Sequence, residues 1–173
     1  MSEPIIPQKV KLFIGIIFND ESILMVIQNK LIKRFGAIDF QSNNIPFNHT
    51  TYYKTMGYEL KKGFFSFKRT IKHEEIVKIK LFTNKLEKKT SGKGGRQLNI
   101  DPGYLTLSNV FLASCKDYFH RVYLGRGIYL ENEYRYVGKQ YLPWDWTYPD
   151  YRKPEYLFFF HEMRKIYMGQ IRR

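Results

Sequence analysis

Residues 11–18 read KLFIGIIF, and this stretch restricts the fold that the rest of the chain can adopt. After Lys11 it contains only apolar residues and one glycine, Gly15, with no polar alternation. A strand tolerates that pattern only where both of its faces are covered. We therefore predict a central strand, with Gly15 marking a bend or a close approach of another backbone.

The segments that follow alternate between helical and extended patterns. Residues 21–35 carry apolar side chains at intervals of four and are followed by Gly36, which predicts a helix that stops there. Residues 37–47 look extended, and we read the aromatic and basic residues 51–71 as a pair of strands. A second helix is predicted to open at Thr70, because acidic residues and then an apolar stripe at helical spacing come after it.

The second half of the chain is predicted to enlarge the sheet. Residues 97–107 indicate a strand that turns at residues 101–103, and residues 108–113 favour a short capped helix. Residues 120–141 look like a β-hairpin or meander, because glycines mark its turns. Pro154 suits the first position of a C-terminal helix.

Strand, helix, two extended segments, helix and strand is the βαββαβ order of a ferredoxin-like sheet backed by two helices. The predicted fold is therefore α+β, with a ferredoxin-like βαββαβ core, an added β-hairpin and a C-terminal helix packed on the sheet. The chain has 173 residues and no abrupt change of composition. Residues 1–173 are accordingly predicted to form a single domain.

The chain is basic, with a formal net charge of +13. Residues 51–96 hold 13 basic and 4 acidic side chains, so most of the excess lies in the middle of the sequence. Such an excess favours polyanionic partners, although lysines on solvated helix surfaces account for it as well. The charge alone leaves both explanations open.

Cysteine usage and hydropathy indicate the compartment. The single cysteine, Cys115, cannot form an internal disulfide and suits a reducing environment; we expect it to be a small buried apolar residue. The apolar runs are strand-sized and the N-terminus lacks the pattern of a signal peptide. We expect a cytoplasmic protein with no membrane partner.

Polar residues are concentrated among apolar ones between Gly94 and Gly127, and buried charges must be paired or put to use. Arginine and lysine there can bind a phosphate or carboxylate, and aspartate can orient them or accept from a ribose-like hydroxyl. We therefore predict a pocket for an anionic small molecule, phosphorylated or nucleotide-like. Its proposed ligand-binding residues are Arg96, Asn99, Asp101, Lys116 and Arg121, with Arg96 and Arg121 as main anchors, and its candidate catalytic residues are His120 and Asp117.

Two other interpretations remain open for these residues and their surroundings. Asp101 could pair with Arg96, and Asp117 with Arg121, in an internal network that only locks the sheet. Alternatively, the sheet could bind single-stranded RNA through the basic stretch 52–72, although an RNP motif is missing. The aromatic residues of that stretch are Tyr52, Tyr53, Tyr58, Phe64, Phe65 and Phe67.

Neither a metal nor a cofactor is predicted. The four histidines are too far apart in the sequence for a local metal motif. On the second predicted helix, Lys80, Thr83, Asn84 and Glu87 share one face beside the apolar stripe. That polar face is typical either of a pocket rim or of an ordinary solvated helix boundary.

Several segments together resemble a known family. They are KLFIGIIF, IDF, TTYYKTMG, IKLFTNKLE, RQLNIDPGYLTL, LASCKD, HRVYL, GIYLE and WTYPDYR, which cover nearly the whole chain. In combination they resemble an uncharacterised prokaryotic family, domain of unknown function 4416. The resemblance implies no activity, ligand or catalytic residue, because none is established for that family.

Overall fold

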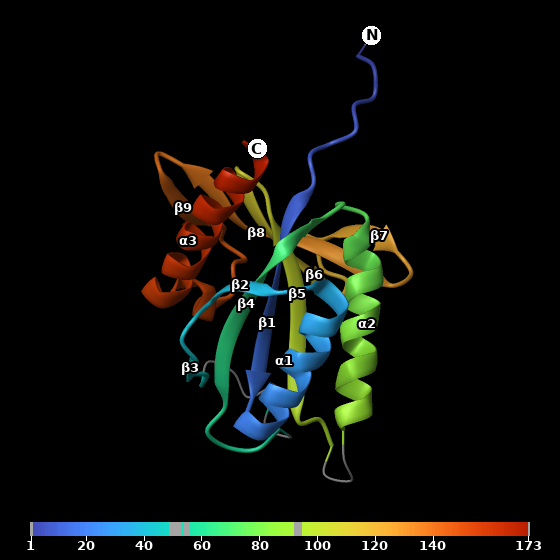
Figure 1. Ribbon diagram of the computed structural model, residues 1–173, viewed down its shortest axis with the longest axis vertical. Helices are drawn as coiled ribbons and strands as arrows, with labels where there is room; N and C mark the ends of the chain where they lie inside the picture. The colour runs from blue at the N-terminus through green and yellow to red at the C-terminus, as the bar shows by residue number, and fades with distance from the viewer. Residues whose placement is uncertain (1, 49–52, 54–55, 92–94, 173) are drawn as a thin grey trace.

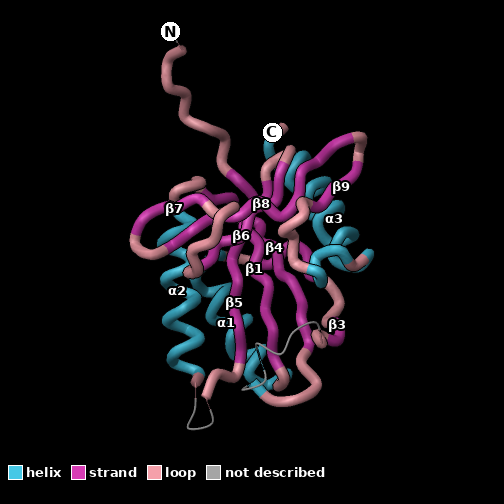
Figure 2. Tube along the Cα trace, turned by 180° about the vertical axis from the view of Figure 1, so that it is seen from behind, coloured by secondary structure: helices cyan, strands magenta, loops and turns pink. Residues whose placement is uncertain are grey.

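The computed structural model describes residues 2–48, 53, 56–91 and 95–172, and these form one antiparallel sheet with helices on both faces (Figures 1 and 2). The strands follow the order β2-β4-β1-β5-β6-β8-β7, with β3 beside β4 and β9 beside β8. The strands are β1 (Val10–Phe18), β2 (Ile38–Gln41), β3 (Ile45–Pro46), β4 (Lys61–Ile71), β5 (Leu98–Leu105), β6 (Asn109–Ser114), β7 (Val122–Gly125), β8 (Ile128–Val137) and β9 (Gln140–Pro143), and the helices are α1 (Glu21–Phe35), α2 (Glu75–Thr90), the short 3-10 helix η2 (Pro149–Arg152) and α3 (Pro154–Ile171).

The first half of the chain builds the centre of the sheet. Strands β1, β2, β4 and β5 lie in the order β2-β4-β1-β5, and every neighbouring pair is antiparallel. Strand β4 is thus inserted between β1 and β2, the two strands that α1 connects, as in a split βαβ unit. The predicted α+β class and the predicted order of core elements are confirmed.

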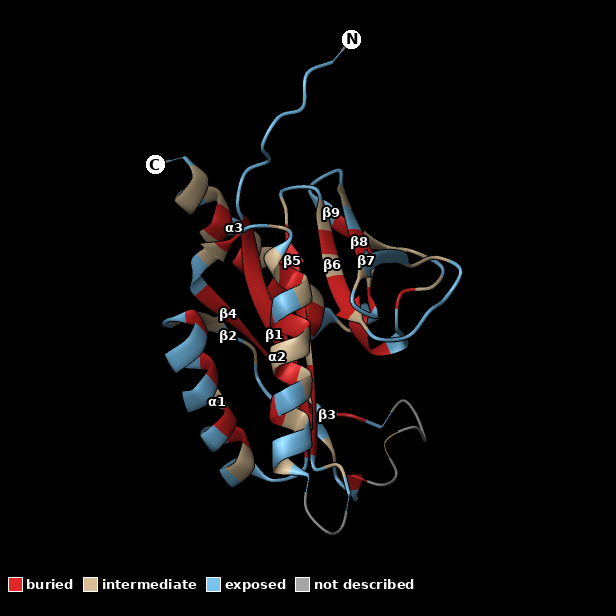
Figure 3. Cartoon of the chain, turned by 90° about the vertical axis from the view of Figure 1, so that its right-hand side faces the viewer, coloured by how far each residue is buried: buried red, intermediate tan, exposed pale blue. Residues whose placement is uncertain are grey.

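Strand β1 is the central strand that its sequence predicts. Every residue of it is buried, and β4 and β5 pair with its two edges. Leu12, Ile14 and Ile16 pack in one cluster with α1 and α2, whereas Phe13 packs in a second cluster with α3. Figure 3 shows the sheet buried beneath its helices, while the segment before β1 is exposed. Both faces of β1 are therefore covered.

Glycine makes room for the aromatic rings of the second cluster. Phe13 lies opposite Gly103 on β5, and Phe64 lies opposite Gly15 on β1. A β-carbon at Gly103 would lie 2.3 Å from the Phe13 ring and 2.2 Å from the Phe111 carbonyl oxygen. The ring of Phe13 crosses the sheet over a position where only hydrogen fits, and it meets Phe160 of α3 edge-on at 5.0 Å.

The outer strands and α3 also match their predictions. Strands β7, β8 and β9 form the predicted meander, and Pro154 occupies the first turn of α3. The buried residues Phe159, Phe160 and Met163 pack α3 onto the sheet in the second cluster. Among the described residues, no helix is both long and apolar enough to cross a membrane.

Three local predictions are wrong. Residues 101–103 do not turn but continue β5, and residues 108–113 contain no helix because β6 occupies them. The second helix begins at Glu75 and not at Thr70, because β4 continues through Ile71. Pairing with β1 and β8 favours extended backbone where the local sequence suggests turns. The predicted first strand of residues 51–71 falls partly on residues 51–52 and 54–55, outside the described residues.

Replacing Gly103 by alanine should destabilise the protein by about 2 kcal/mol, because the new methyl group collides with the Phe13 ring and a strand carbonyl. Chemical denaturation monitored by circular dichroism would measure it. Gly169 is the matched control, since nothing lies within 4 Å of a β-carbon there in α3. Gly169→Ala should be neutral or stabilising by roughly 0.5–1 kcal/mol. Equal effects of the two substitutions would contradict the close-approach argument.

Candidate functional site

The candidate site lies where the sheet forks. Strands β5 and β6 pair only through residues 103–105 and 110–112, although β5 begins at Leu98 and β6 continues to Ser114. The first half of β5 therefore presents an edge that β6 does not cover. Side chains of α2 bind that edge: Glu87 Oε1 accepts from the Ile100 N–H at 2.7 Å, and Lys80 Nζ donates to the Ile100 carbonyl at 3.1 Å.

A cavity of about 840 Å³ opens at this fork. Its wall combines one face of α2, the diverging ends of β5 and β6, and the η2 segment. Six basic and four acidic residues take part in the wall, together with aromatic and aliphatic side chains. The charged residues are Lys62, Lys80, Lys85, Lys88, Arg96, Lys116, Glu87, Asp101, Glu131 and Asp150.

Lys80 and Asp101 form the ion pair nearest the fork, with Nζ and Oδ1 2.9 Å apart. Burial would lower the pKa of Lys80, but the charge and hydrogen bond of Asp101, together with the charge of Glu87, outweigh it and raise the pKa. Burial would likewise raise the pKa of Asp101, yet the charge and hydrogen bond of Lys80, together with Lys62 and Asn99, outweigh it and lower the pKa. Each partner thus keeps the other charged in a poorly solvated wall.

A second set of contacts continues from this pair toward Arg96. The Arg96 guanidinium donates to Glu87 Oε2 at 2.5 Å and also to the Asn99 side chain, and Asn99 donates to Asp101. Burial, followed by the charge of Asp101, raises the pKa of Glu87 despite Lys80 and Arg96. These contacts join α2 to β5 through charged and polar groups, in addition to the apolar packing of the first cluster.

The wall on the far side of the fork holds another buried lysine. Lys62 on β4 is 5% exposed and its Nζ lies 2.5 Å from Asp150 Oδ2 on η2. The ammonium also lies 4.4 Å from the centre of the Tyr151 ring, with Phe47 and Phe64 slightly farther away. An aromatic cage together with a carboxylate holds this cation in place.

Arg121 fixes the part of the wall that contains Glu131. Its Nε donates to Glu131 Oε2 at 3.0 Å, and its terminal nitrogens donate to Ser114 Oγ, the Lys116 carbonyl and the Tyr148 hydroxyl at 2.8–3.1 Å. Burial would lower the pKa of Arg121, but Glu131 and Tyr148 outweigh it and raise the pKa. His120 Nε2 lies 2.9 Å from the same Glu131 oxygen, and its ring stacks on Trp146.

The structure brings four of the seven predicted site residues together. Arg96, Asn99, Asp101 and Lys116 line the cavity, whereas Asp117, His120 and Arg121 do not. Arg121 and His120 contact Glu131 without lining the cavity themselves, and the anchoring of a ligand by Arg121 stays a prediction. Asp117 is exposed, and together with burial it raises the pKa of Tyr129.

The ion pairs also differ from those expected. Asp101 pairs with Lys80 and not with Arg96, and Arg121 pairs with Glu131 and not with Asp117. The polar face of α2 lines the cavity through Lys80, Asn84 and Glu87, as a pocket rim would. Cys115 is exposed at the cavity and not buried; its sulfur accepts from Asn84 Nδ2 at 3.0 Å.

Sequence reasoning did not place Lys62, Glu131, Tyr148 or Asp150 in the pocket. Lys62 on β4 is far in sequence from residues 94–127, and Tyr148 and Asp150 lie beside or in η2, whereas Glu131 on β8 follows that stretch closely. A local signal existed in the segment WTYPDYR, residues 146–152, where an acidic residue stands among aromatic ones. Nothing in the sequence of that segment indicates that it lines the cavity.

The comparisons with known proteins place the chain in a family. A family model described as "Domain of unknown function (DUF4416)" matches residues 8–167. The chain belongs to this family. No curated protein and no solved structure matches it. The predicted family is confirmed, and the match spans every strand and helix that contributes to the cavity wall.

The wall is suited to binding polar groups. Lysine and arginine can donate to an anion, the carboxylates can accept from hydroxyl or amino groups, and Phe47 and Tyr53 add aromatic surface. Within the described part of the chain, no group of three or more histidine, cysteine, aspartate or glutamate residues could hold a metal ion.

Lys80→Met should destabilise the protein by about 3 kcal/mol at pH 7, because it leaves Asp101 and the Ile100 carbonyl without a buried cation. In the wild type, the lowered pKa of Asp101 means that its contribution is present above about pH 4 and is lost as pH falls through the folded pKa. The raised pKa of Lys80 means that its contribution is lost only as pH rises above about 10.

In Lys80→Met, burial should instead raise the pKa of Asp101, so the variant should recover part of its stability between pH 7 and pH 5. Urea unfolding at several pH values would measure the difference. Lys78→Met, an exposed position on the same helix, should change stability by less than about 0.5 kcal/mol. A pH-independent loss in Lys80→Met would contradict the role of Asp101.

Proposed function

We propose that the cavity at the fork binds an anionic small molecule, phosphorylated or nucleotide-like. The observation that carries the proposal is a cavity of about 840 Å³ whose wall contains two buried lysines and a basic excess. Small-molecule sites commonly have about 300–1,000 Å³, with a few polar groups among apolar ones. The size and the composition of the wall both suit such a ligand.

Donors for an anion lie both in the buried part of the cavity wall and in its exposed part. Lys62 and Lys80 are each 5% exposed, while Lys85, Lys88 and Lys116 are exposed around them. Within the described residues, Lys80 donates two bonds of the three that an ammonium can make. Arg96 adds a guanidinium beside the same wall. A phosphate entering the cavity thus meets positive charge along its path.

The aromatic side chains favour a nucleotide or sugar over a bare anion. Phe47 and Tyr53 lie edge to face with their ring centres 5.7 Å apart, and both line the cavity with Tyr151. Flat rings provide surface for a base or for the apolar face of a sugar. The candidate catalytic residues His120 and Asp117 do not line the cavity, so the proposal concerns binding.

RNA binding is the second candidate. The observation in its favour is the basic stretch, but Phe64, Phe65 and Phe67 are 0–4% exposed in the core and cannot stack on bases. Tyr58 is exposed, and Tyr52 lies outside the described residues. Dependence of binding on exposed lysines far from the cavity would favour this candidate.

A panel of nucleotides and sugar phosphates should contain compounds that raise the melting temperature. A ligand at about a hundred times its dissociation constant adds roughly 2.7 kcal/mol of stability. The double variant Lys85→Glu/Lys88→Glu, at exposed positions of the wall, should raise the dissociation constant of such a compound at least tenfold. Lys61→Glu/Lys78→Glu, which has the same change of charge outside the cavity, should not.

The single cysteine provides a direct reporter of occupancy. Cys115 lines the cavity and is exposed, so a bound phosphorylated compound should slow its reaction with a thiol reagent such as DTNB. Stabilisation without protection of Cys115 would place the ligand elsewhere. If only RNA raised the melting temperature, the pocket proposal would fail.

A further inference from the structure

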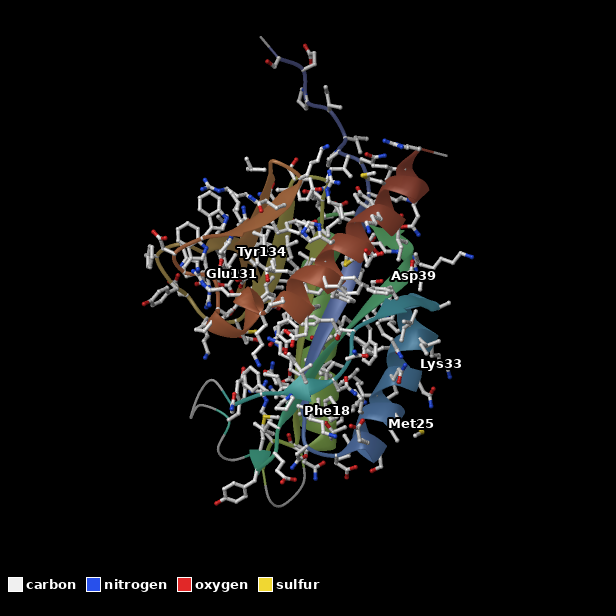
Figure 4. The ribbon with its side chains drawn as sticks, turned by 90° about the vertical axis from the view of Figure 1, so that its left-hand side faces the viewer. Phe18, Met25, Lys33, Asp39, Glu131 and Tyr134 are labelled. Carbon is white, nitrogen blue, oxygen red and sulfur yellow. The ribbon has the colours of Figure 1, made fainter. Side chains whose placement is uncertain are left out.

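The inner end of the cavity differs in character from its mouth. Lys85, Lys88 and Lys116 at the mouth are exposed, whereas Glu131 and Asp150 in the inner wall are 1% and 4% exposed. Glu131 and Asp150 thus lie in the buried part of the wall, together with Lys62 and Lys80. Figure 4 marks Glu131 beside Tyr134 on β8, away from Phe18 at the end of β1.

Glu131 is held firmly but only through one of its oxygens. Both Arg121 Nε and His120 Nε2 contact Oε2, at 3.0 and 2.9 Å. Among the described residues, no group bonds to Oε1, although this atom is buried. An unpaired buried carboxylate oxygen is costly. Both oxygens of Glu133 also lack a partner among the described residues, but of the two acids only Glu131 lines the cavity. Arg121 is itself anchored by three further contacts, so the position of Glu131 is built and not incidental.

The neighbouring Glu133 supplies a matched comparison. It lies two residues along β8, is fully buried and does not line the cavity. Burial, followed by the charge of Glu131, raises the pKa of Glu133 well above its usual range. Glu131, in contrast, forms an ion pair with the guanidinium of Arg121. Glu131 is therefore the stronger hydrogen-bond acceptor of the two acids.

We infer that the ligand carries, in addition to its anionic group, a hydroxyl or amino donor that Glu131 Oε1 accepts from inside the cavity. The inference rests on the proposed function and narrows it to phosphorylated polyols and amino sugars, including the sugar moiety of nucleotides. In this arrangement the anionic group stays near the lysines of the wall, and the donor end enters first. One molecule then binds both the lysines and Glu131.

Three phosphates of similar size test the inference by calorimetry. Glucose 6-phosphate carries hydroxyls, glucosamine 6-phosphate carries hydroxyls and an ammonium, and cyclohexylmethyl phosphate carries neither. The two sugar phosphates should bind wild-type protein at least about tenfold more tightly than cyclohexylmethyl phosphate, the usual effect of one charge-assisted hydrogen bond. A further gain for glucosamine 6-phosphate would identify an ammonium as the preferred donor, and equal affinities would identify a hydroxyl.

Glu131→Gln should remove the advantage of the sugar phosphates while leaving cyclohexylmethyl phosphate unchanged. The amide oxygen will accept from Arg121 and His120, which places the amide NH₂, a donor, where Oε1 stood. Glu133→Gln, the control, should retain the advantage, because Glu133 does not line the cavity and glutamine has nearly the same shape. If Glu131→Gln fails to fold, equal binding of the three phosphates by the wild type still overturns the inference.

The outcomes separate this inference from the proposed function. If all three phosphates bind wild type equally, or if Glu133→Gln removes the advantage as fully as Glu131→Gln, the role of Glu131 is wrong while anion binding stands. If none of the three binds at millimolar concentration, the proposed function itself fails and the inference fails with it.

Discussion

The site depends on one constraint, the uncovered edge of β5. A buried strand edge must have its N–H and carbonyl groups paired, and at Ile100 no strand is present to pair them. Lys80 and Glu87 of α2 pair them instead. Those two side chains bring charge into the wall, and each charge then requires a partner, Asp101 for Lys80 and Arg96 for Glu87. The cavity and its electrostatics both follow from where β5 and β6 part.

The sequence alone predicted the elements whose extent is set by their own residues. Strand β1 is apolar on both faces because α1, α2 and α3 cover both, and α1 begins and ends within its predicted residues because its cap and its terminal glycine are local. The sequence misled where pairing overrides local preference. Asp101-Pro102-Gly103 reads as a turn, but Gly103 is needed under the Phe13 ring, and Pro102 remains in a strand that β6 does not pair with at that residue.

Part of the candidate site could be predicted because some of its residues are close together in the sequence. Arg96, Asn99 and Asp101 follow one another on or next to β5, so their convergence is a local property. The partners of these residues come from other elements, and sequence spacing cannot specify them. Asp101 has Arg96 five residues away, yet Lys80 reaches it across the fork from α2. Arg121 is likewise drawn to Glu131 by the pairing of β7 with β8, which a sequence alone does not align.

The energetics of the fork argue for a role in binding. Buried ion pairs contribute little net stability, and apolar residues of equal volume commonly replace them without loss. A fork with only a structural role would be filled with apolar side chains like Phe13, Phe159 and Phe160, which pack α3 onto the sheet. This fork holds Lys62, Lys80, Asp101, Glu131 and Asp150 around open space, with one oxygen of Glu131 lacking a partner among the described residues. A polar ligand in the cavity would supply the partner that this oxygen lacks, and that deficit supports the proposed function.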